Sequence, residues 1–425
     1  MRKTKIAIIG GGASGLFCAS LLANDERLSI YIYEKNNKLG KKILASGNGK
    51  CNFTNNGDYT SKYNTPFANK IISKFDANST IDYFKSLGLI YKYDSEGRCY
   101  PYSESAVTVL NCLKSTLKGT KILLEKEVVD IYKDGNMYVV KGEDFEDRYD
   151  CVVCSSGSLA SNLGSDKAYN YLKTLNIEFT RFKSSLAPVV TKEKTKNLTG
   201  VRIKCLLKLL NENKKVVYTE PGEVIFKDNG LSGIAVFNAT SYMNRNNGKY
   251  SIVLDLVNNL SDDELLSYFE NRNNCEFLGL FNEKLASYLT ERYSKQLNSP
   301  REIVDLIRNV SFSVEKMYPL SDSQVCSGGV EIDSVNNNLS LKKHENVYVS
   351  GELLDVDGVC GGYNLQFAWS SGAVIAMDIK RRLNKWNKVI FYLINTILDI
   401  VVYLSVYCFK IHEICINSVA HIVLN

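Results

Sequence analysis

The chain has 425 residues, of which 45% are hydrophobic and 23% charged, with a net charge of +6 and only three histidines. This length and composition are typical of a globular protein of two or three domains, and so small a net charge is no signature of a dedicated nucleic-acid-binding protein. The scarcity of histidine argues against a Ser-His-Asp triad or a multi-histidine metal centre, so we expect a cofactor to carry any chemistry and no metal to be bound.

The first predicted element is an apolar strand that leads directly into a glycine-rich turn. Gly10, Gly12 and Gly15 have G-x-G-x-x-G spacing, and a second apolar run, residues 28–33, ends at Glu34. A strand, a turn, a helix, a second strand and a terminal carboxylate together predict a dinucleotide-binding βαβ unit. In such a unit the glycines allow a tight turn and the close approach of a pyrophosphate, while the acid accepts hydrogen bonds from ribose hydroxyls.

No signal sequence precedes this strand, so we expect a cytoplasmic protein whose 12 cysteines are unpaired thiols. Cys151 and Cys154 have C-x-x-C spacing, but they lie in a strand-like run, where residues three apart face opposite sides. We therefore do not expect them to form a redox pair or a metal site.

The following elements are predicted from the periodicity of apolar residues. Helical spacing occurs near 67–87 and 104–117, and strand-like runs follow at 121–132, 137–141 and 149–154. From residue 186 short β-type runs dominate, at 201–210, 215–218, 223–226 and 251–256, and a polar helical stretch at about 261–310 interrupts them. An apolar run returns at 346–351, before a long helix that begins near Gly362. A strand that returns after a β-rich insertion predicts a nucleotide domain built from two separated pieces of chain.

The returning strand favours FAD over NAD as the dinucleotide. It ends at Gly351 and Glu352, and a glycine-containing segment, residues 355–364, then leads into the N-terminus of the long helix. In two-dinucleotide flavoproteins such a glycine and acid reach the ribityl chain and pyrophosphate. Backbone amides at the helix N-terminus can stabilise the flavin N1/O2 region, which becomes negative on reduction.

Several motifs resemble those of one flavoprotein family. They are KKILASGNGKCN (41–52), GRCYPYS (97–103), GLSG (230–233), VCSGGV (325–330), GELLDVDG (351–358) and GGYNLQ (361–366). Together they are similar to the signatures of the BaiN-like flavoproteins, also called the aminoacetone-oxidase family, over about residues 4–383. The resemblance departs from the family pattern at Lys50, where the family has arginine, and at residues 155–158 and 164–169.

The resemblance implies an α/β fold with a discontinuous, two-dinucleotide-binding Rossmann-type FAD domain and an inserted middle domain, which is a β-barrel with a helical part. The expected boundaries are 1–185 for the first FAD-domain segment, 186–344 for the middle domain with its helical part at about 261–310, 345–383 for the second FAD-domain segment, and 384–425 for a hydrophobic tail.

The resemblance also implies non-covalent FAD, with one group of residues at the ADP half and another around the flavin. Together with the glycine turn, the expected cofactor-binding residues are Gly10, Gly12, Ala13, Ser14, Gly15, Glu34, Lys35, Lys42, Asn48, Gly49, Cys51, Asn52, Val128, Gly157, Gly351, Glu352, Asp357, Gly358, Asn364 and Leu365. Val128 is expected near the adenine, in a strand formed by residues 127–129.

The roles of individual side chains stay open at this point. Cys51 and Lys50 are the candidate catalytic residues besides the flavin itself, although Cys51 could simply pack beneath the ring. Lys50 and Lys42 could steer an anionic substrate or offset the cofactor phosphates. Arg98, with the tyrosines after it, could form a substrate pocket or a structural loop, and Asp357 could donate a proton or cap the following turn.

The C-terminal tail contains a mainly apolar run, residues 389–409, that follows a basic segment. It is long enough to span a bilayer, but Asp399 near its middle would cost about 3 kcal/mol on insertion scales. A membrane anchor, an interfacial helix and a packed helix are therefore all kept as interpretations.

The expected activity is that of an FAD-dependent oxidoreductase. We expect reduction of an unsaturated or carbonyl small molecule by hydride transfer through flavin N5, with NAD(P)H as a transient reductant. Three alternatives are a flavin oxidase of small amines, a flavin-dependent reductase of uracil in RNA, and a non-catalytic FAD-binding protein.

Overall fold

The computed structural model describes residues 2–162, 169–270, 277–293 and 299–384. The chain divides into two compact units, Met1–Ile375 and Ala376–Asn425, and the sheets described here all belong to the first. The candidate membrane segment, residues 389–409, lies outside the described residues. Within the described ranges, none of the helices has both the length and the apolar character that a bilayer crossing requires.

A five-stranded parallel sheet underlies the N-terminal part of the chain, with the order β19-β10-β1-β2-β6. Its strands are β1 (Thr4–Ile9), β2 (Leu28–Glu34), β6 (Lys121–Leu124), β10 (Cys151–Cys154) and β19 (Val347–Val349). The central strand β1 is apolar on both faces, and Ile6, Ala7 and Ile8 are fully buried, as expected for a parallel sheet covered on both sides. The predicted Rossmann-type sheet is thus confirmed, including a strand contributed by a distant segment of the chain.

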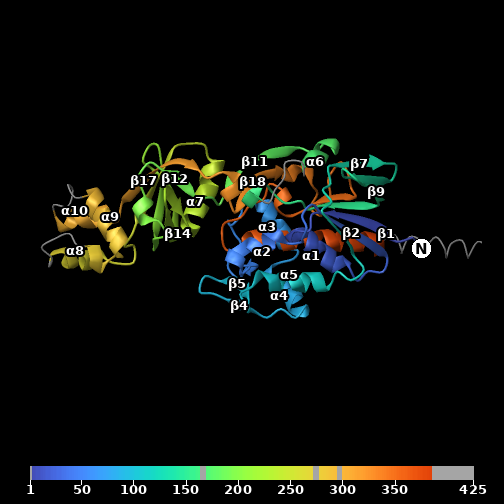
Figure 1. Cartoon of the computed structure of the whole chain (residues 1–425), viewed down its shortest axis with the longest axis horizontal. Coiled ribbons are helices and arrows are strands. Elements are labelled where there is room, and N and C mark those ends of the chain that lie inside the picture. Colours follow the sequence, from blue (N-terminus) through green and yellow to red (C-terminus); the bar gives the residue numbers. More distant parts are fainter. Residues whose placement is uncertain (1, 163–168, 271–276, 294–298, 385–425) are drawn as a thin grey trace, which may run out of the picture. The chain divides into compact units, whose positions relative to one another are not determined.

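Helices and small sheets complete this part of the fold (Figure 1). The helices are α1 (Ala13–Leu22), α2 (Lys41–Ala45), α3 (Pro66–Ile72), α4 (Ala77–Ser86), α5 (Ala106–Ser115) and α6 (Asn170–Thr174), and residues 363–384 are also helical. The small sheets are β3 (Thr54–Asn55) with β5 (Arg98–Pro101) and β4 (Tyr91–Tyr93); β7 (Asp130–Asp134) with β8 (Met137–Lys141) and β9 (Glu146–Tyr149); and β11 (Phe179–Ser185) with β18 (Val325–Val330).

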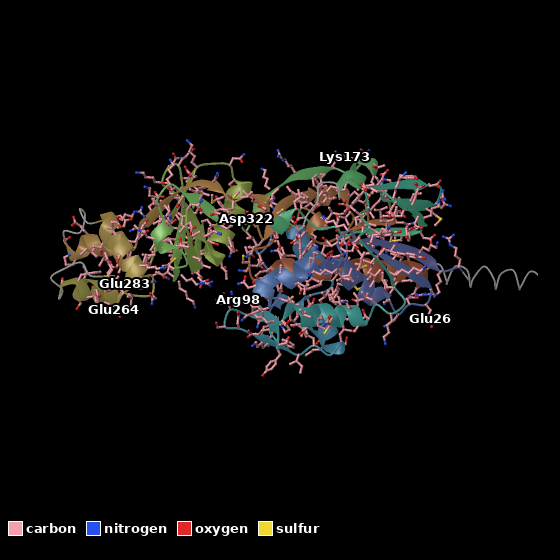
Figure 2. The ribbon with its side chains drawn as sticks, in the orientation of Figure 1. Glu26, Arg98, Lys173, Glu264, Glu283 and Asp322 are labelled. Atoms are coloured by element: carbon pink, nitrogen blue, oxygen red, sulfur yellow. The ribbon has the colours of Figure 1, made fainter. Side chains whose placement is uncertain are left out.

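Local sequence explains where the surface helices begin. Asp76 caps α4 by accepting a hydrogen bond from the Ser79 N–H at 2.8 Å, and Pro66 occupies the first turn of α3 behind the Thr65 cap. Both are standard helix starts, since they satisfy or remove donors that have no partner in the first turn. Outside the core, charged side chains such as Glu26, Glu264 and Glu283 point outward (Figure 2).

A closed six-stranded barrel forms the inserted part, with the order β12-β15-β14-β13-β16-β17. Its strands are β12 (Val189–Thr191), β13 (Arg202–Asn211), β14 (Val216–Lys227), β15 (Gly230–Ser232), β16 (Tyr250–Asp255) and β17 (Val310–Met317). Along β13, Cys205, Leu207 and Leu209 point into the barrel core, which follows the two-residue period of a strand. Helix α7 (Ile234–Arg245) follows β15 directly and packs against β14.

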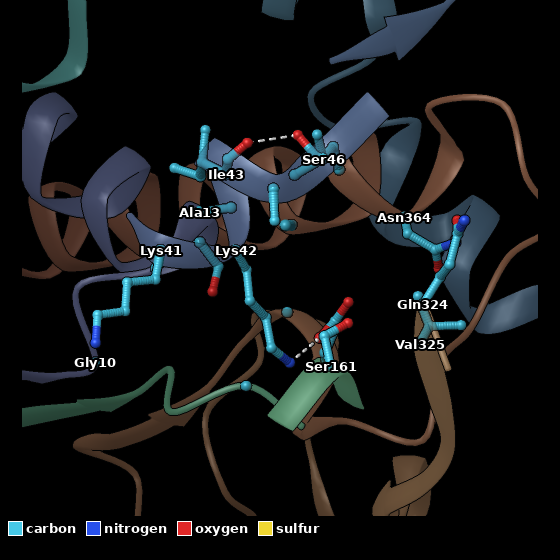
Figure 3. A pocket seen from close by; sticks show the side chains of 18 of the residues that line it. Gly10, Ala13, Lys41, Lys42, Ile43, Ser46, Ser161, Gln324, Val325 and Asn364 are labelled. Carbon is cyan, nitrogen blue, oxygen red and sulfur yellow. Dashed lines mark hydrogen bonds and ion pairs between the residues drawn. The ribbon is translucent and has the colours of Figure 1, made fainter. Parts of the chain in front are cut away.

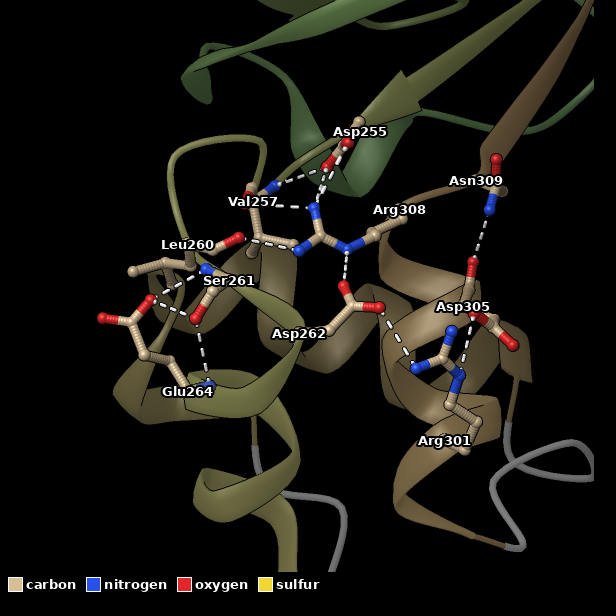
Figure 4. A network of polar contacts seen from close by, with 10 residues as sticks. All are labelled: Asp255, Val257, Leu260, Ser261, Asp262, Glu264, Arg301, Asp305, Arg308 and Asn309. Atoms are coloured by element: carbon tan, nitrogen blue, oxygen red, sulfur yellow. Dashed lines mark hydrogen bonds and ion pairs between the residues drawn. The ribbon is translucent and has the colours of Figure 1, made fainter.

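Three helices, α8 (Asp262–Glu270), α9 (Glu283–Tyr293) and α10 (Pro300–Ile307), form the helical part beside the barrel. Arg308, just after α10, joins this part to the barrel (Figure 4): it pairs with Asp255 at the end of β16 at 3.4 Å and with Asp262 at the start of α8 at 2.8 Å. Arg308 also donates to the Leu260 carbonyl at 2.7 Å. A barrel with a helical part is therefore confirmed.

Two local predictions are wrong. Residues 215–218 and 223–226 were expected as separate strands but belong to the single strand β14, which pairs with β13 along its length around one irregularity near Leu210. Residues 127–129 lie between β6 and β7 and form no strand. Both outcomes depend on whether a neighbouring strand is available for ladder pairing: β14 pairs with β13, and residues 127–129 are not part of a ladder. Local periodicity does not encode such pairing.

Candidate cofactor and substrate site

The residues that follow four strands of the parallel sheet meet at one cavity. Gly10 follows β1, Lys35 follows β2, Ser155 follows β10, and Gly351 comes shortly after β19; all four line a cavity of about 600 Å³ (Figure 3). The carboxyl ends of parallel strands lie at the same edge of the sheet, and ligands of open α/β sheets bind outside that edge. The topology therefore creates a cavity at the place where the sequence predicts the cofactor site.

Most of the predicted cofactor-binding residues line this cavity. They are Gly10, Gly12, Ala13, Ser14, Glu34, Lys35, Lys42, Asn48, Asn52, Val128, Gly157, Gly351, Glu352, Asn364 and Leu365. Five predicted residues are not among its lining residues, namely Gly15, Gly49, Cys51, Asp357 and Gly358.

The three glycines of the first turn serve different purposes. A Cβ on Gly10, whose φ is +105°, would lie 2.5 Å from the Ser155 carbonyl oxygen, and one on Gly15 would lie 2.2 Å from the Gly10 carbonyl oxygen. These two positions need glycine because the backbone packs tightly there. A Cβ on Gly12, by contrast, would meet no protein atom within 4 Å and would enter the cavity.

The N-terminus of α1 faces this open side of Gly12. Gly12 is the N-cap residue and has no side chain to cap the helix, and the first turn of α1 contains no acidic residue. An N-terminus of this kind attracts anions, because its backbone N–H groups and the helix dipole both favour negative charge. The site thus fits the pyrophosphate of a dinucleotide such as FAD.

Glu34 is held in place by backbone contacts. Its Oε2 accepts a hydrogen bond from the Gly11 N–H at 2.9 Å, and its Oε1 accepts from the Asn36 N–H at 2.8 Å. The carboxylate lies at the cavity with only 7% of the residue exposed, as expected for an acceptor of ribose hydroxyls. Burial lowers the pKa of the neighbouring Lys35 ammonium, while the charges of Glu127 and Glu34 oppose that shift.

Lys42 extends from α2 into the cavity (Figure 3). Its Nζ donates to the Ser158 carbonyl at 2.9 Å and forms an ion pair with Glu352 Oε2 at 3.0 Å, and Ser158 Oγ donates to the same carboxylate oxygen at 2.9 Å. Residues from three distant segments are thereby tied together at the cavity wall. The Glu352 charge partly neutralises Lys42, so this lysine does not offer an unpaired positive charge to an anionic substrate.

The motif around residues 46–52 adopts unusual backbone geometry. Gly47, Asn48, Gly49 and Cys51 all have positive φ, between +53° and +83°. Asn48 tolerates this region comparatively well, but cysteine rarely adopts it, and such backbone strain tends to be found at functional sites. The segment is anchored to the neighbouring glycine-containing wall, since the following Asn55 donates to the Gly361 carbonyl at 2.9 Å.

The structure separates the two candidate catalytic residues. The Cys51 side chain is fully buried and does not line the cavity, and burial raises the pKa of its thiol to about 12. Cys51 therefore has the environment of a packed core thiol. Lys50 does line the cavity but forms an ion pair with Glu104 at 2.6 Å.

Asp357 and Gly358 differ from their expected role at the cofactor. The Asp357 carboxylate accepts from Ser185 Oγ at 3.0 Å and forms an ion pair with Arg245, so it points away from the cavity wall. It does not cap the following turn either: Asn364 does so, exchanging two hydrogen bonds of 2.8 Å with Gly358. Gly358 is needed because a Cβ would lie 2.8 Å from the Tyr63 ring.

Sequence reasoning missed the contribution of α7 to the site. Ile234 and Phe237 of this helix line the cavity, and so do Leu186 and Gln324 from neighbouring segments. None belongs to a recognised cofactor motif, although the GLSG run at 230–233 ends at the N-cap of α7 and marks the helix start.

Arg98 was expected to form either a substrate pocket or a structural loop. It lines the cavity and also pairs with Asp94 at 2.6 Å, so it contributes to both.

Comparisons with known proteins place this architecture among flavoproteins. The model of the HI0933-like protein Rossmann domain family matches residues 4–378. A 3-dehydro-bile acid delta(4,6)-reductase of Clostridium scindens is 31% identical over 87% of this chain and 97% of the relative. Ribosomal RNA dihydrouridine synthases of Haemophilus influenzae and Escherichia coli are 27% and 26% identical, over 88% and 89% of this chain and 98% of each relative.

Proposed function

The chain belongs to the HI0933-like family of Rossmann-type, FAD-dependent oxidoreductases, and from this premise we propose that it reduces a carbon–carbon double bond conjugated with a carbonyl group in an apolar small molecule. The predicted family, the FAD cofactor and the enzyme class are confirmed. The substrate class and the use of NAD(P)H as reductant are our proposal.

The names of the relatives support this type of reaction. A delta(4,6)-reductase of a 3-dehydro bile acid and a synthase of dihydrouridine both saturate ring double bonds, and in both substrates a carbonyl group activates the ring. Reduction of such a bond needs a hydride for one carbon and a proton for the other. FAD, when bound, supplies the hydride chemistry at flavin N5.

The apolar wall contributed by Leu186, Ile234 and Phe237 is the observation that carries the proposal. Leu186 is almost fully buried, whereas Ile234 and Phe237 are half-buried and border the cavity. Burying an apolar ring against such side chains contributes binding free energy of about 25 cal/mol per Å². Gln324 provides a polar group in the same wall, which suits one carbonyl oxygen on an otherwise apolar substrate.

The charged residues around Lys50 and Arg98, both of which line the cavity, favour a small molecule over RNA. Lys50 and Lys92 both pair with Glu104, at 2.6 and 2.5 Å, and they lower the pKa of its carboxyl group to about 2. Arg98 pairs with Asp94 at 2.6 Å and with Glu96 at 3.1 Å. Three cationic groups are thus matched by three carboxylates, whereas RNA binding relies on cations left available for phosphates.

The cavity residues have separate tasks under this proposal. The N-terminus of α1 at Gly12 holds the pyrophosphate and Glu34 holds the adenosine ribose, while Asn52, Asn364 and Leu365 border the flavin. Ile234 and Phe237 exclude water from the face on which the substrate lies.

Anaerobic mixing tests the proposal. The purified holoprotein is reduced with NADH or NADPH and then offered a 3-dehydro-delta(4,6) bile acid or a ribosomal RNA transcript. In a separate arm the oxidised holoprotein is mixed with aminoacetone in air. We expect loss of the visible flavin absorbance with a nicotinamide nucleotide and its return with the bile acid only. Return with RNA would replace the proposal by uracil reduction, and peroxide formation from aminoacetone in air would replace it by amine oxidation.

A variant pair links this activity to α7. Phe237→Ala should raise the KM for the bile acid about tenfold, since it removes most of an aromatic contact worth roughly 1.4 kcal/mol. Val107→Ala is the control, because Val107 is 51% exposed on α5 and does not line the cavity. Equal KM values in the two variants would contradict a substrate site at α7.

A further inference from the structure

The segment from Asp355 to Gly362 forms part of the cavity wall, although its two aspartates do not. Cys360, Gly361 and Gly362 line the cavity. Glycines offer no side chain through which a wall can be fixed, so the position of this wall depends on what holds the backbone around it.

Helix α7 holds this segment at several points. Asn238 Oδ1 accepts a hydrogen bond from the Cys360 N–H at 2.9 Å. Ser241 Oγ donates to Asp357 Oδ2 at 3.3 Å, and Arg245 Nη2 pairs with Asp357 Oδ1 and, at 3.4 Å, with Asp355 Oδ1. Residues 238, 241 and 245 are three and four positions apart, so they lie along one face of the helix.

The carboxylate of Asp357 is the central acceptor of this arrangement. Asp357 is only 2% exposed, and a third donor, Ser185 Oγ, reaches it at 3.0 Å. A carboxylate that is removed from water needs a paired cation and hydrogen bonds, and Arg245 is the cation that pairs with it. The backbone of Asp357 is fixed as well, since its N–H donates to Asn64 Oδ1 at 3.0 Å.

We propose that Arg245 is a positioning residue for the flavin end of the site. Through the buried Asp357 carboxylate it fixes the first part of the segment, while Asn238 and Asn55 hold Cys360 and Gly361 directly, and together these contacts position the glycine-containing wall at residues 360–362. Arg245 itself does not line the cavity, so it acts through Asp357 and the backbone. The inference rests on FAD binding and is independent of which substrate is reduced.

The same helix also carries Ile234 and Phe237 at the cavity. A displacement of α7 therefore moves the cofactor wall and the proposed substrate wall together. Two residues of α7 fix the position of the helix along the 355–362 segment. Arg245 lies at the C-terminal end of α7 and Asn238 near its middle.

Two arginine variants test this role against a purely structural one. Arg245→Met removes the cation from Asp357, and Arg308→Met removes the cation from Asp255, which is likewise buried but lies at the junction with the helical part. The Kd for FAD is measured by flavin fluorescence, and the visible absorbance and circular dichroism of the bound flavin are recorded. We expect Arg245→Met to raise the Kd at least tenfold and alter both spectra, and Arg308→Met to leave all three unchanged.

A conservative variant, Arg245→Lys, should restore FAD binding because it keeps the positive charge. Only Nη2 of Arg245 contacts the two aspartates, so the fork geometry of the guanidinium is not used and a lysine ammonium can serve. Arg245→Lys should therefore bind FAD with a Kd within about threefold of the wild-type value and give its spectra. The double variant Arg245→Met, Asp357→Asn removes the uncompensated charge and keeps the test valid should Arg245→Met alone not fold.

The Kd and the flavin spectra distinguish a positioning role of Arg245 from a purely structural one. A raised Kd and altered flavin spectra in the double variant support a positioning role for Arg245, because this variant folds but lacks the Arg245–Asp357 ion pair. Wild-type Kd and spectra in the double variant, or equal behaviour of Arg245→Met and Arg308→Met, would overturn the proposal. Because no measurement involves a substrate, failure here is distinct from failure of the proposed reaction.

Discussion

Two arginine–aspartate clamps with similar chemistry hold different kinds of backbone. Arg308 joins Asp255 at the end of a barrel strand to Asp262 at the start of α8 and to the Leu260 carbonyl, and each of these groups belongs to a structural junction (Figure 4). Arg245 joins α7 to Asp357, beyond which lies a cavity wall that contains glycines. Loss of the first clamp should therefore affect the free energy of unfolding, and loss of the second should also affect ligand binding.

The largest stability effect is expected at the structural clamp. Arg308→Met leaves the buried Asp255 carboxylate without its cation, which should lower the free energy of unfolding by about 3 kcal/mol. Urea unfolding of the FAD-bound protein measures the change. In the double variant with Asp255→Asn the loss should be smaller, because no unpaired charge is then buried. A loss below about 1 kcal/mol in the single variant would show that this clamp is not structural.

The glycine turn offers a similar contrast within a few residues. Gly15→Ala places a methyl group 2.2 Å from the Gly10 carbonyl oxygen, so the backbone must shift. Overpacking of this kind should cost about 2 kcal/mol of stability in the protein without cofactor, as measured by thermal or urea unfolding. An unchanged unfolding midpoint would mean that α1 does not pack against the turn as the structure shows.

Gly12 should respond in the opposite way. Gly12→Val directs its side chain into the cavity, because a Cβ at this position meets no protein atom within 4 Å. Valine is a poorer N-cap residue than glycine, so stability without FAD should fall by at most about 1 kcal/mol. The Kd for FAD should rise about tenfold or more, because the side chain occupies the space of the pyrophosphate. Fluorescence titration checks this. Wild-type affinity in this variant would place the pyrophosphate elsewhere.

The last effect is absent at neutral pH and concerns two buried thiols, one in each region. Burial raises the pKa of Cys51 and of Cys205 to about 12, above the ordinary value of 9.0. Below pH 9 the thiols are protonated in both the folded and the unfolded chain. Between pH 9 and 12 only the unfolded chain releases the proton, so each thiol should lower stability by about 1.4 kcal/mol per pH unit.

Cysteine-to-alanine variants isolate this alkaline effect. Cys51→Ala and Cys205→Ala should each unfold with a shallower loss of stability above pH 9 than the wild type, and by similar amounts. A change confined to Cys51→Ala would indicate that the neighbouring site, rather than burial, sets the thiol pKa.

Local sequence predicted the parts of the site whose chemistry depends on neighbouring residues. The spacing of Gly10, Gly12 and Gly15 with Glu34 was sufficient because turn geometry, helix start and strand end are all encoded within about 30 residues. The same holds for the strand that ends before Gly351. Gly10, Gly12, Glu34 and Gly351 reach one cavity because parallel strands place their carboxyl ends at a common edge, whereas Gly15 packs against the turn.

Residues whose role depends on distant partners could not be assigned in this way. Asp357 and Gly358 belong to the GELLDVDG motif, yet Asp357 pairs with Arg245, and Gly358 packs on Tyr63. Arg245 and Phe237 belong to no recognised motif. Helix α7 brings Phe237 to the cavity and Arg245 to Asp357.

The sequence by itself thus determined the first βαβ unit and most of the glycine and polar residues at the cavity, because these depend on short-range spacing and backbone conformation. It also indicated FAD, through the distant returning strand and through the resemblance of its motifs to a flavoprotein family. Only the tertiary structure decided that Cys51 is a packed thiol, that Lys42 and Lys50 are paired with carboxylates, and that α7 supplies the apolar wall. Those outcomes depend on burial and on contacts between residues up to 310 positions apart, such as Lys42 and Glu352, which no local pattern records.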